Sequence, residues 1–106
     1  MLEVHKDNFD AEVLNADGIV MVDFWGESCE VCLEIMPDIV DLSKKYENNI
    51  KFCKLNIKGN RRLAMSQKVM GLPSFVFYKD GEPVAKISGE DVEPSEVEEK
   101  IKELIS

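Results

Sequence analysis

The spacing of apolar residues along the chain alternates between two patterns. A near-continuous apolar run occupies Ile19–Trp25 and predicts a strand buried on both faces of a sheet, and Ile50–Ile57 is expected to be a second central strand. A third strand is expected at Ser74–Lys79. Elsewhere apolar residues recur every three or four positions, from Cys32 to Tyr46 and from Val97 to Ile105. This second spacing predicts two amphipathic helices, each with one buried face.

Polar caps, glycines and prolines indicate where the other elements begin and end. Asp7 or Asn8 is expected to cap a short helix that ends at Gly18, and Ser28 is expected to cap the helix after the first buried strand. Pro94 suits the first turn of the last helix. The further expected elements are an edge strand at Leu2–His5, a short helix at Asn60–Val69, a hairpin turn at Lys79–Glu82 and a closing strand at Val84–Ser88.

The expected order of elements is βαβαβαββα. Strands that alternate with helices favour parallel pairing through right-handed crossovers. Asp80–Gly81 supplies the positive φ angles of a tight hairpin, so the last two strands should be antiparallel. We therefore expect an α/β fold with a mixed central sheet and helices on both faces. The 106 residues, 44% of them hydrophobic, suit a single domain spanning residues 1–106.

Charge and cysteine usage narrow the classes of function. The net charge is −8, from 13 basic and 21 acidic residues, which argues against nucleic acid or an anionic membrane as partner. Three cysteines are too few, and odd in number, for a secreted disulfide framework. The first residues do not have the pattern of a secretory signal, and no apolar run is long enough to cross a membrane. We expect a protein of the reducing cytoplasm.

Cys29 and Cys32 carry the candidate chemistry. They are two residues apart and follow a buried strand where a helix is expected to begin. The N-terminus of a helix stabilises a thiolate, which is the reactive form of cysteine. The spacing therefore predicts a redox-active pair, with an exposed first sulfur and a shielded second one. A zinc site is disfavoured because only Cys53 and His5 could add ligands, and they are far apart and unpaired.

Two charged residues interrupt the apolar strands. Asp23 lies within the first buried strand, where burial should raise the pKa of its carboxyl. Such a carboxyl could relay the proton of Cys32. Lys54 lies within the next strand, where it either pairs with Asp23 or extends to the surface. Cys53, in the same strand, is expected to be a buried and inert thiol.

Taken together, these residues resemble the thioredoxin family over nearly the whole chain. The motifs that recur in the order and spacing of that family are Val22-Asp-Phe-Trp25, Cys29-x-x-Cys32, Pro37, Lys54-Leu-Asn56, Gly71-Leu-Pro73, Lys79-Asp-Gly81 and Gly89. The resemblance implies the thioredoxin fold and dithiol–disulfide exchange with disulfide-containing proteins. It also implies that no cofactor is bound, and that a flavoprotein thioredoxin reductase re-reduces the Cys29–Cys32 disulfide. We expect a monomer.

The resemblance also assigns roles to individual residues. Cys29 matches the attacking cysteine and Cys32 the resolving one. Asp23 matches a buried carboxylate, and Lys54 matches its lysine neighbour. The residues that match the substrate-binding surface are Trp25, Leu72, Pro73 and Gly89, with a cis bond before Pro73.

The sequence departs from the family pattern inside the motif. Glu30-Val31 stands where thioredoxins usually carry Gly-Pro, and Ser28 stands where they usually carry Trp. The stretch Lys54–Pro73 also resembles thioredoxin variants of anaerobic bacteria associated with glycine reductase. Two alternatives to a general disulfide reductase therefore stay open. One is a dedicated electron donor to a single reductase complex, and the other is a redox-inactive module with the same fold.

Overall fold

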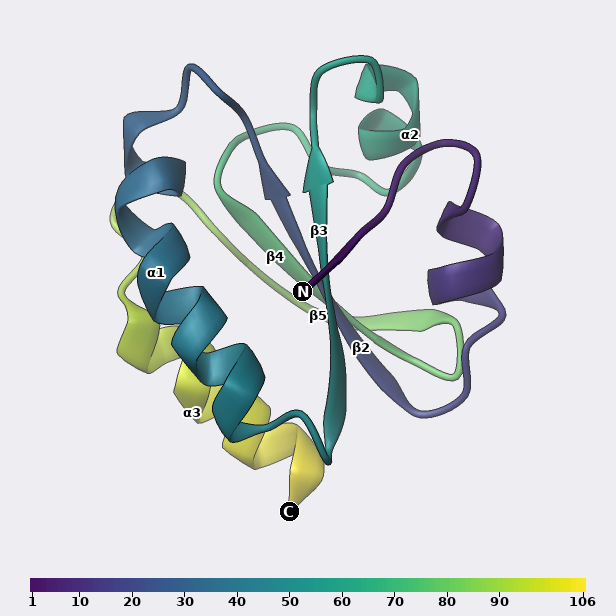
Figure 1. Ribbon diagram of the computed structural model, residues 1–106, viewed down its shortest axis with the longest axis vertical. Coiled ribbons are helices and arrows are strands. Elements are labelled where there is room, and N and C mark those ends of the chain that lie inside the picture. Colours follow the sequence, from purple (N-terminus) through teal and green to yellow (C-terminus); the bar gives the residue numbers. More distant parts are fainter.

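A computed structural model describes residues 1–106 as a five-stranded sheet with helical segments on both faces (Figure 1). The strands lie in the order β1-β3-β2-β4-β5. In chain order, the elements are β1 (Leu2–Glu3), η1 (Asp10–Leu14), β2 (Ile19–Trp25), α1 (Glu30–Lys45), β3 (Ile50–Asn56), α2 (Arg61–Ser66), β4 (Ser74–Lys79), β5 (Glu82–Ser88) and α3 (Pro94–Ile105).

The pairing of the strands follows the expected mixed pattern. Both β1 and β2 pair with β3 in parallel, since helical crossovers separate them in sequence. β4 then pairs antiparallel with β2, and β5 pairs antiparallel with β4 through the hairpin. The predicted α/β fold with a mixed central sheet is therefore confirmed, and β2 lies at its centre between β3 and β4.

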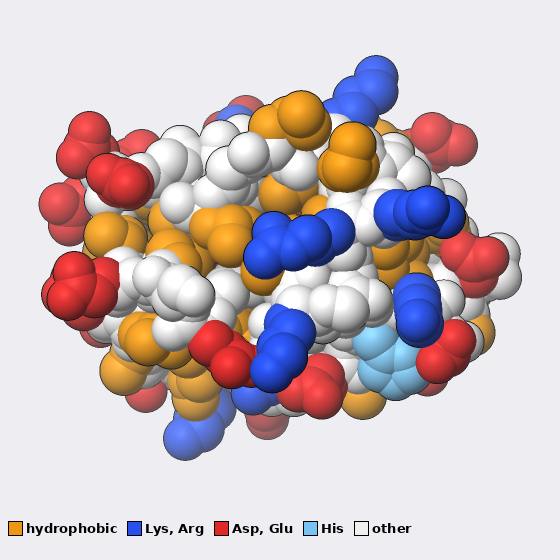
Figure 2. All heavy atoms as spheres, turned by 90° about the horizontal axis from the view of Figure 1, so that it is seen from above, with side chains coloured by type: hydrophobic (Ala, Val, Ile, Leu, Met, Phe, Trp, Pro, Cys, Tyr) orange, Lys and Arg blue, Asp and Glu red, His pale blue; other side chains and the backbone are white.

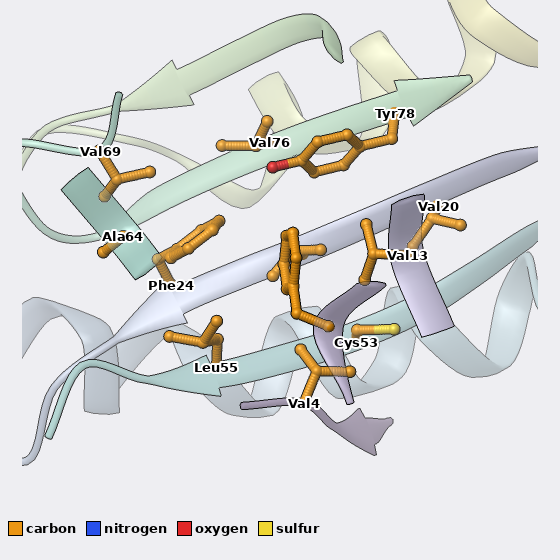
Figure 3. Packing of buried hydrophobic residues seen from close by; sticks show 12 residues of the cluster. Val4, Val13, Val20, Phe24, Cys53, Leu55, Ala64, Val69, Val76 and Tyr78 are labelled. Atoms are coloured by element: carbon orange, nitrogen blue, oxygen red, sulfur yellow. The ribbon is translucent and has the colours of Figure 1, made fainter. Parts of the chain in front are cut away.

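Each face of the sheet carries its own hydrophobic cluster, because side chains alternate along a strand. On one face, Val20 and Phe24 of β2 pack beneath η1 and α2. Figure 3 shows Phe24 close to Ala64 of α2 and Leu55 of β3. On the other face, residues of β2, β3 and β4 pack beneath α1 and α3; the most buried are Met21, Ile39, Phe75, Phe77, Val97 and Ile101.

Two of the expected helix caps are wrong. The N-cap of α1 is Cys29, whose Sγ accepts a hydrogen bond from the Cys32 N–H at 3.2 Å, and not Ser28. Before the first helical segment, Asn8 Oδ1 accepts from the preceding His5 N–H at 2.7 Å. The Asn8 side chain thus stabilises the turn formed by residues 5–8, which precedes the helical segment. The segment itself, η1, is a single π-helical turn without a side-chain cap, so neither Asp7 nor Asn8 caps it.

Several other elements differ in length from the sequence expectation. β1 ends at Glu3 and β3 at Asn56, whereas β5 begins earlier, at Glu82. α2 covers only Arg61–Ser66, because the chain leaves the helix at Gln67 and adopts a left-handed conformation at Lys68. Pro94 occupies the first turn of α3 as expected, after a capping box formed by Glu93 and Glu96. No helix combines the length and apolarity that a membrane span requires.

The β4–β5 hairpin turn is fixed against the loop that precedes β2. Asp80 and Gly81 both have positive φ, of 49° and 83°, as the Asp-Gly pair predicted. Asp80 donates its N–H to the Gly18 carbonyl at 2.9 Å, and its Oδ1 accepts from the Gly18 N–H at 2.8 Å. A Cβ at Gly81 would lie 2.1 Å from the Leu14 carbonyl oxygen. Only glycine fits this turn against the end of η1.

Candidate active site

The two predicted redox cysteines form a disulfide at the N-terminus of α1. Their Cα atoms are 5.2 Å apart. Because β2 ends at Trp25 and α1 begins at Glu30, the pair sits at the edge of the sheet where the chain turns from strand into helix. The two sulfurs differ in access, since Cys29 is half-buried whereas Cys32 is 1% exposed. The expected contrast between an accessible first sulfur and a shielded second sulfur is therefore present.

Cys29 lines two hollows of the surface. The larger, of about 530 Å³, lies on the side of α2 and is lined in part by Gly26, Lys58, Arg61 and Leu72. The smaller, of about 380 Å³, lies on the side of α1 and is lined by Ser28, Cys29, Glu30, Val31, Leu72 and Glu90. Leu72 lines both hollows. The loop that carries Leu72 therefore borders Cys29 in both hollows.

Asp23 is buried beneath α1 without a hydrogen-bond partner. Along β2 its side chain projects to the same face as Met21, which packs against Ile35 and Ile39 of α1. The residue is 1% exposed, and neither carboxyl oxygen has a hydrogen-bond partner. Removal from water disfavours the ionised form and raises the pKa of Asp23 from 3.8 to about 7. A carboxyl with this pKa can both accept and donate a proton near neutral pH.

Lys54 lies directly beside Asp23 across the β2–β3 pairing. The two residues are register partners on parallel strands. Lys54 is half-buried and forms no ion pair with Asp23, but its charge opposes the rise of the Asp23 pKa. The expected alternative of an Asp23–Lys54 ion pair is therefore not seen, and the lysine acts on the carboxyl only through its charge.

The loop before β4 brings Leu72, Pro73 and Gly89 together. The Leu72–Pro73 peptide bond is cis, as expected, and Pro73 is buried. The Gly89 N–H donates to the Pro73 carbonyl at 3.1 Å, and Ser74 Oγ donates to the Gly71 carbonyl at 2.6 Å. The N–H and carbonyl of Leu72 take part in none of the loop hydrogen bonds. The Leu72 backbone therefore has no hydrogen-bond partner within the loop.

Trp25 and Gly26 complete the approach from β2 to Cys29. Trp25 is half-buried, its indole N–H has no partner, and it lines neither hollow at Cys29. Gly26 was not singled out by the sequence reasoning. A Cβ there would lie 3.0 Å from Leu72 Cδ1 and 3.2 Å from Ile57 Cγ2. The absence of a side chain at Gly26 thus allows Leu72 to approach the cysteine loop. The sequence signal that could have identified Gly26 was its position between Trp25 and the cysteine motif.

Cys53 lies apart from this site. It is fully buried in the cluster beneath η1 and α2, on the face of the sheet opposite to α1 (Figure 3). Burial raises the pKa of its thiol to about 11, which leaves almost no thiolate at neutral pH. The expectation of a buried thiol is confirmed. No three His, Cys, Asp or Glu side chains come together in a way that could hold a metal ion.

The sequence matches a known protein family over nearly its whole length. A family model described as Thioredoxin matches residues 1–103. The chain belongs to the thioredoxin family. Thioredoxins that resemble it include that of Acetoanaerobium sticklandii, which is 44% identical over 105 residues, or 99% of this chain and 100% of that protein. The thioredoxin of Peptoclostridium acidaminophilum is 44% identical over 91 residues, covering 86% of this chain and 83% of the relative.

A more distant relative shows the same family. The thioredoxin of Pseudomonas aeruginosa is 37% identical over 81 residues, covering 76% of this chain and 75% of the relative. Membership in the thioredoxin family and the Cys29–Cys32 disulfide together make this chain a thiol–disulfide oxidoreductase that reduces protein disulfides. A redox-inactive module and a donor dedicated to one complex are not favoured.

Proposed function

We propose that this thioredoxin-family protein reduces protein disulfides with Cys29 as the attacking cysteine and Cys32 as the resolving cysteine. The observation that carries the assignment is the difference in access between the two sulfurs. Cys29 is half-buried and lines both hollows, whereas Cys32 is 1% exposed and lines neither. A substrate disulfide can reach the first sulfur directly, and only a group already held at Cys29 comes within reach of the second.

The reaction consists of two thiol–disulfide exchanges. The Cys29 thiolate, favoured at the N-terminus of α1, attacks one sulfur of the substrate disulfide, and the other substrate sulfur leaves as a thiolate. The Cys32 thiolate then attacks the Cys29 sulfur of the mixed disulfide. The second substrate sulfur leaves, and the Cys29–Cys32 disulfide forms. Two electrons pass to the substrate, which takes up two protons as its thiolates are neutralised.

Asp23 serves the second exchange as the group that takes the proton of Cys32. Three observations support this role. Asp23 projects to the α1 face, its carboxyl oxygens are free of protein partners, and its pKa of about 7 suits proton exchange at neutral pH. Lys54 acts through Asp23, because its positive charge keeps that pKa from rising further. In this proposal Asp23 moves the proton and Lys54 tunes the carboxyl.

The substrate binds in an extended conformation beside Leu72. The unpaired N–H and carbonyl of Leu72 offer a donor and an acceptor for strand-like pairing with the chain on one side of the substrate cysteine. Pro73 and Gly89 hold this segment in place through their backbone hydrogen bond, and Trp25 directly follows Phe24, the register partner of Ser74 at the start of β4. The pairing is between backbones and so suits many substrate sequences.

The same proposal covers the partners and setting of the protein. A flavoprotein thioredoxin reductase returns two electrons to the Cys29–Cys32 disulfide, so no cofactor needs to be bound. The chain works as one domain and as a monomer, without nucleic acid or membrane as partner. A cysteine content of three, with the only free thiol buried, suits the reducing cytoplasm.

Trapping the mixed disulfide tests the assignment. Cys32→Ser and Cys29→Ser are each made in a Cys53→Ala background, reduced, freed of reductant and incubated with insulin. Mass spectrometry of the intact proteins should show an insulin-chain adduct on Cys29 in Cys32→Ser and almost none in Cys29→Ser. A stable adduct on Cys32 in Cys29→Ser, with Cys32→Ser inert to trapping, would mean that the roles are reversed. The Cys53→Ala parent keeps both Cys29 and Cys32. If this parent failed to reduce insulin, the function itself would be refuted.

A further inference from the structure

Four positive side chains gather on the α2 side of the active site, and we call them the basic cluster: Lys6, Lys58, Arg61 and Arg62. Lys58 and Arg61 line the larger hollow beside Cys29. Arg61 and Arg62 also line an adjoining hollow together with Lys6. The backbone of Lys6 is held there by a hydrogen bond of 2.8 Å, in which the Lys6 N–H donates to Asn60 Oδ1. In the view onto this end of the molecule, Lys and Arg side chains gather on the half that carries α2 (Figure 2).

The basic cluster does not stabilise the fold by ion pairing. All four residues are exposed, and none belongs to an ion pair. Arg61 and Arg62 also occupy the first turn of α2, where a positive charge opposes the helix dipole. In a chain of net charge −8 these free cations stand out against the overall field. Their placement therefore suits a partner better than it suits folding.

The other side of Cys29 is negative, and we call its six carboxylates the acidic cluster: Glu30, Glu34, Asp38, Glu90, Asp91 and Glu93. Glu30 and Glu90 line the smaller hollow beside Cys29. A neighbouring hollow, of about 330 Å³ between α1 and the start of α3, is lined by all of the cluster except Glu30. Figure 2 shows acidic side chains along the edge opposite to the basic half. One carboxylate, that of Glu27, lies on the basic side and lines the larger hollow. Its Oε2 accepts a hydrogen bond from Asn56 Nδ2 at 2.9 Å.

An apolar groove joins the basic side of the site to the Leu72 loop. It has a volume of about 280 Å³ and is lined mainly by apolar residues of α2 and of the loop before β4. Two methionines on it are unusually exposed, Met65 at 61% and Met70 at 82%. Leu72 and Arg61 line both this groove and the larger hollow at Cys29. Flexible methionine side chains adapt to different apolar partners.

We propose that the protein selects its substrates by the order of charges around the reacting cysteine. The surface around Cys29 binds an extended segment of a protein substrate. This segment has an apolar residue beside its cysteine, carboxylates on one side of that cysteine and cations on the other. The carboxylates meet the basic cluster, the apolar side chain enters the groove at Met65 and Met70, and the cations meet the acidic cluster. The reversed order would place like charges together on both sides. This inference rests on the proposed attack by Cys29.

The test uses three short synthetic peptides, each with one cysteine flanked by leucines and blocked as a methyl disulfide. One has two glutamates before the cysteine and two lysines after it, the second has the reverse order, and the third has glutamines at all four positions. The reduced protein is mixed with each at low ionic strength, and chromatography of quenched samples follows the freed peptide. The two charged peptides should differ by roughly threefold to tenfold in rate, and 0.5 M salt should shrink the difference.

Matched variants show whether the basic cluster causes the difference. Lys58→Gln with Arg61→Gln should reduce the ratio of the two rates at least twofold. Lys44→Gln with Lys79→Gln removes the same charge from exposed residues outside the cluster and should leave the ratio unchanged. Equal rates for the two charged peptides, or a ratio that both double variants change alike, would refute the inference. The glutamine peptide separates the two proposals, since a protein that fails to reduce it lacks the proposed function altogether.

Discussion

Asp23 offers a quantitative test of how burial acts on this active site. Replacing it with asparagine keeps the size of the side chain and removes its titration. The unfolded carboxyl ionises near the ordinary pKa of 3.8, whereas the folded one ionises near 7. Between these values the unfolded state binds fewer protons than the folded state, so the wild-type protein should lose stability as the pH rises from about 4 to about 7. Above pH 7 this loss is complete and constant.

The size of the effect follows from the same pKa difference. Each pKa unit is worth about 1.4 kcal/mol, so the change from 3.8 to about 7 costs roughly 4 kcal/mol in the free energy of unfolding at pH 8. About 3 kcal/mol of this cost arises between pH 5 and pH 8. In Asp23→Asn the cost is absent. The variant should therefore gain about 3 kcal/mol relative to wild type between pH 5 and pH 8, whatever constant penalty the buried amide adds.

Urea unfolding of the oxidised proteins, followed by circular dichroism at half-unit steps from pH 5 to pH 9, measures this difference. The contributions of other titrating groups cancel when the variant is compared with wild type at each pH. Lys54→Met is the matched perturbation, because loss of the lysine charge should raise the pKa of Asp23 further. The stability of Lys54→Met should then continue to fall above pH 7. The free energies of unfolding of Asp23→Asn and wild type could instead differ by a constant amount from pH 5 to pH 8. That result would show that the folded carboxyl ionises normally, and the proposed proton transfer would lose its basis.

Two further predictions concern residues that lie away from the active site, Gly81 and Cys53. Gly81→Ala should lower the free energy of unfolding by about 2 kcal/mol or more, because the new Cβ would lie 2.1 Å from the Leu14 carbonyl oxygen at a φ of +83°. Gly59→Ala is the control, with a φ of +78° but open space around the Cβ, and thermal unfolding should show a loss of only about 1 kcal/mol. Cys53→Ala should keep most of the insulin-reducing activity and lose about 1 kcal/mol of stability to the cavity it leaves. A collapse of activity in a folded Cys53→Ala protein would assign that thiol a redox role.

The order and type of the elements could be predicted from the sequence, because they depend on interactions between near neighbours in the chain. The apolar run in β2 required burial on both faces, and residues such as Ile35 and Ile39 required a helix with one buried stripe. The Asp80–Gly81 pair likewise fixed the hairpin through its own backbone preference. The Cys29–Cys32 pair could be read as a redox site for the same reason, since its spacing matches one turn at the start of a helix.

Local detail at element ends was less predictable, because several residues compete for the same backbone groups. Ser28, Asp7 and Asn8 all have side chains that suit an N-cap. In the folded chain, however, Cys29 takes the extended conformation of the cap, and Asn8 bonds back to His5. The positions of these residues depend on how the preceding strand or loop is held, which the sequence of the segment alone does not specify.

Only the tertiary structure decided which distant residues surround the reactive sulfur. The parallel pairing of β2 with β3 sets Lys54 beside Asp23, and burial beneath α1 gives that carboxyl a pKa of about 7. Packing of the loop before β4 against the cysteine turn brings Leu72 to Cys29 and leaves its backbone unpaired. The same folding separates the basic cluster from the acidic cluster across the site. Periodicity along the chain determines which face of an element is buried, but contacts between elements determine the environment of each charge.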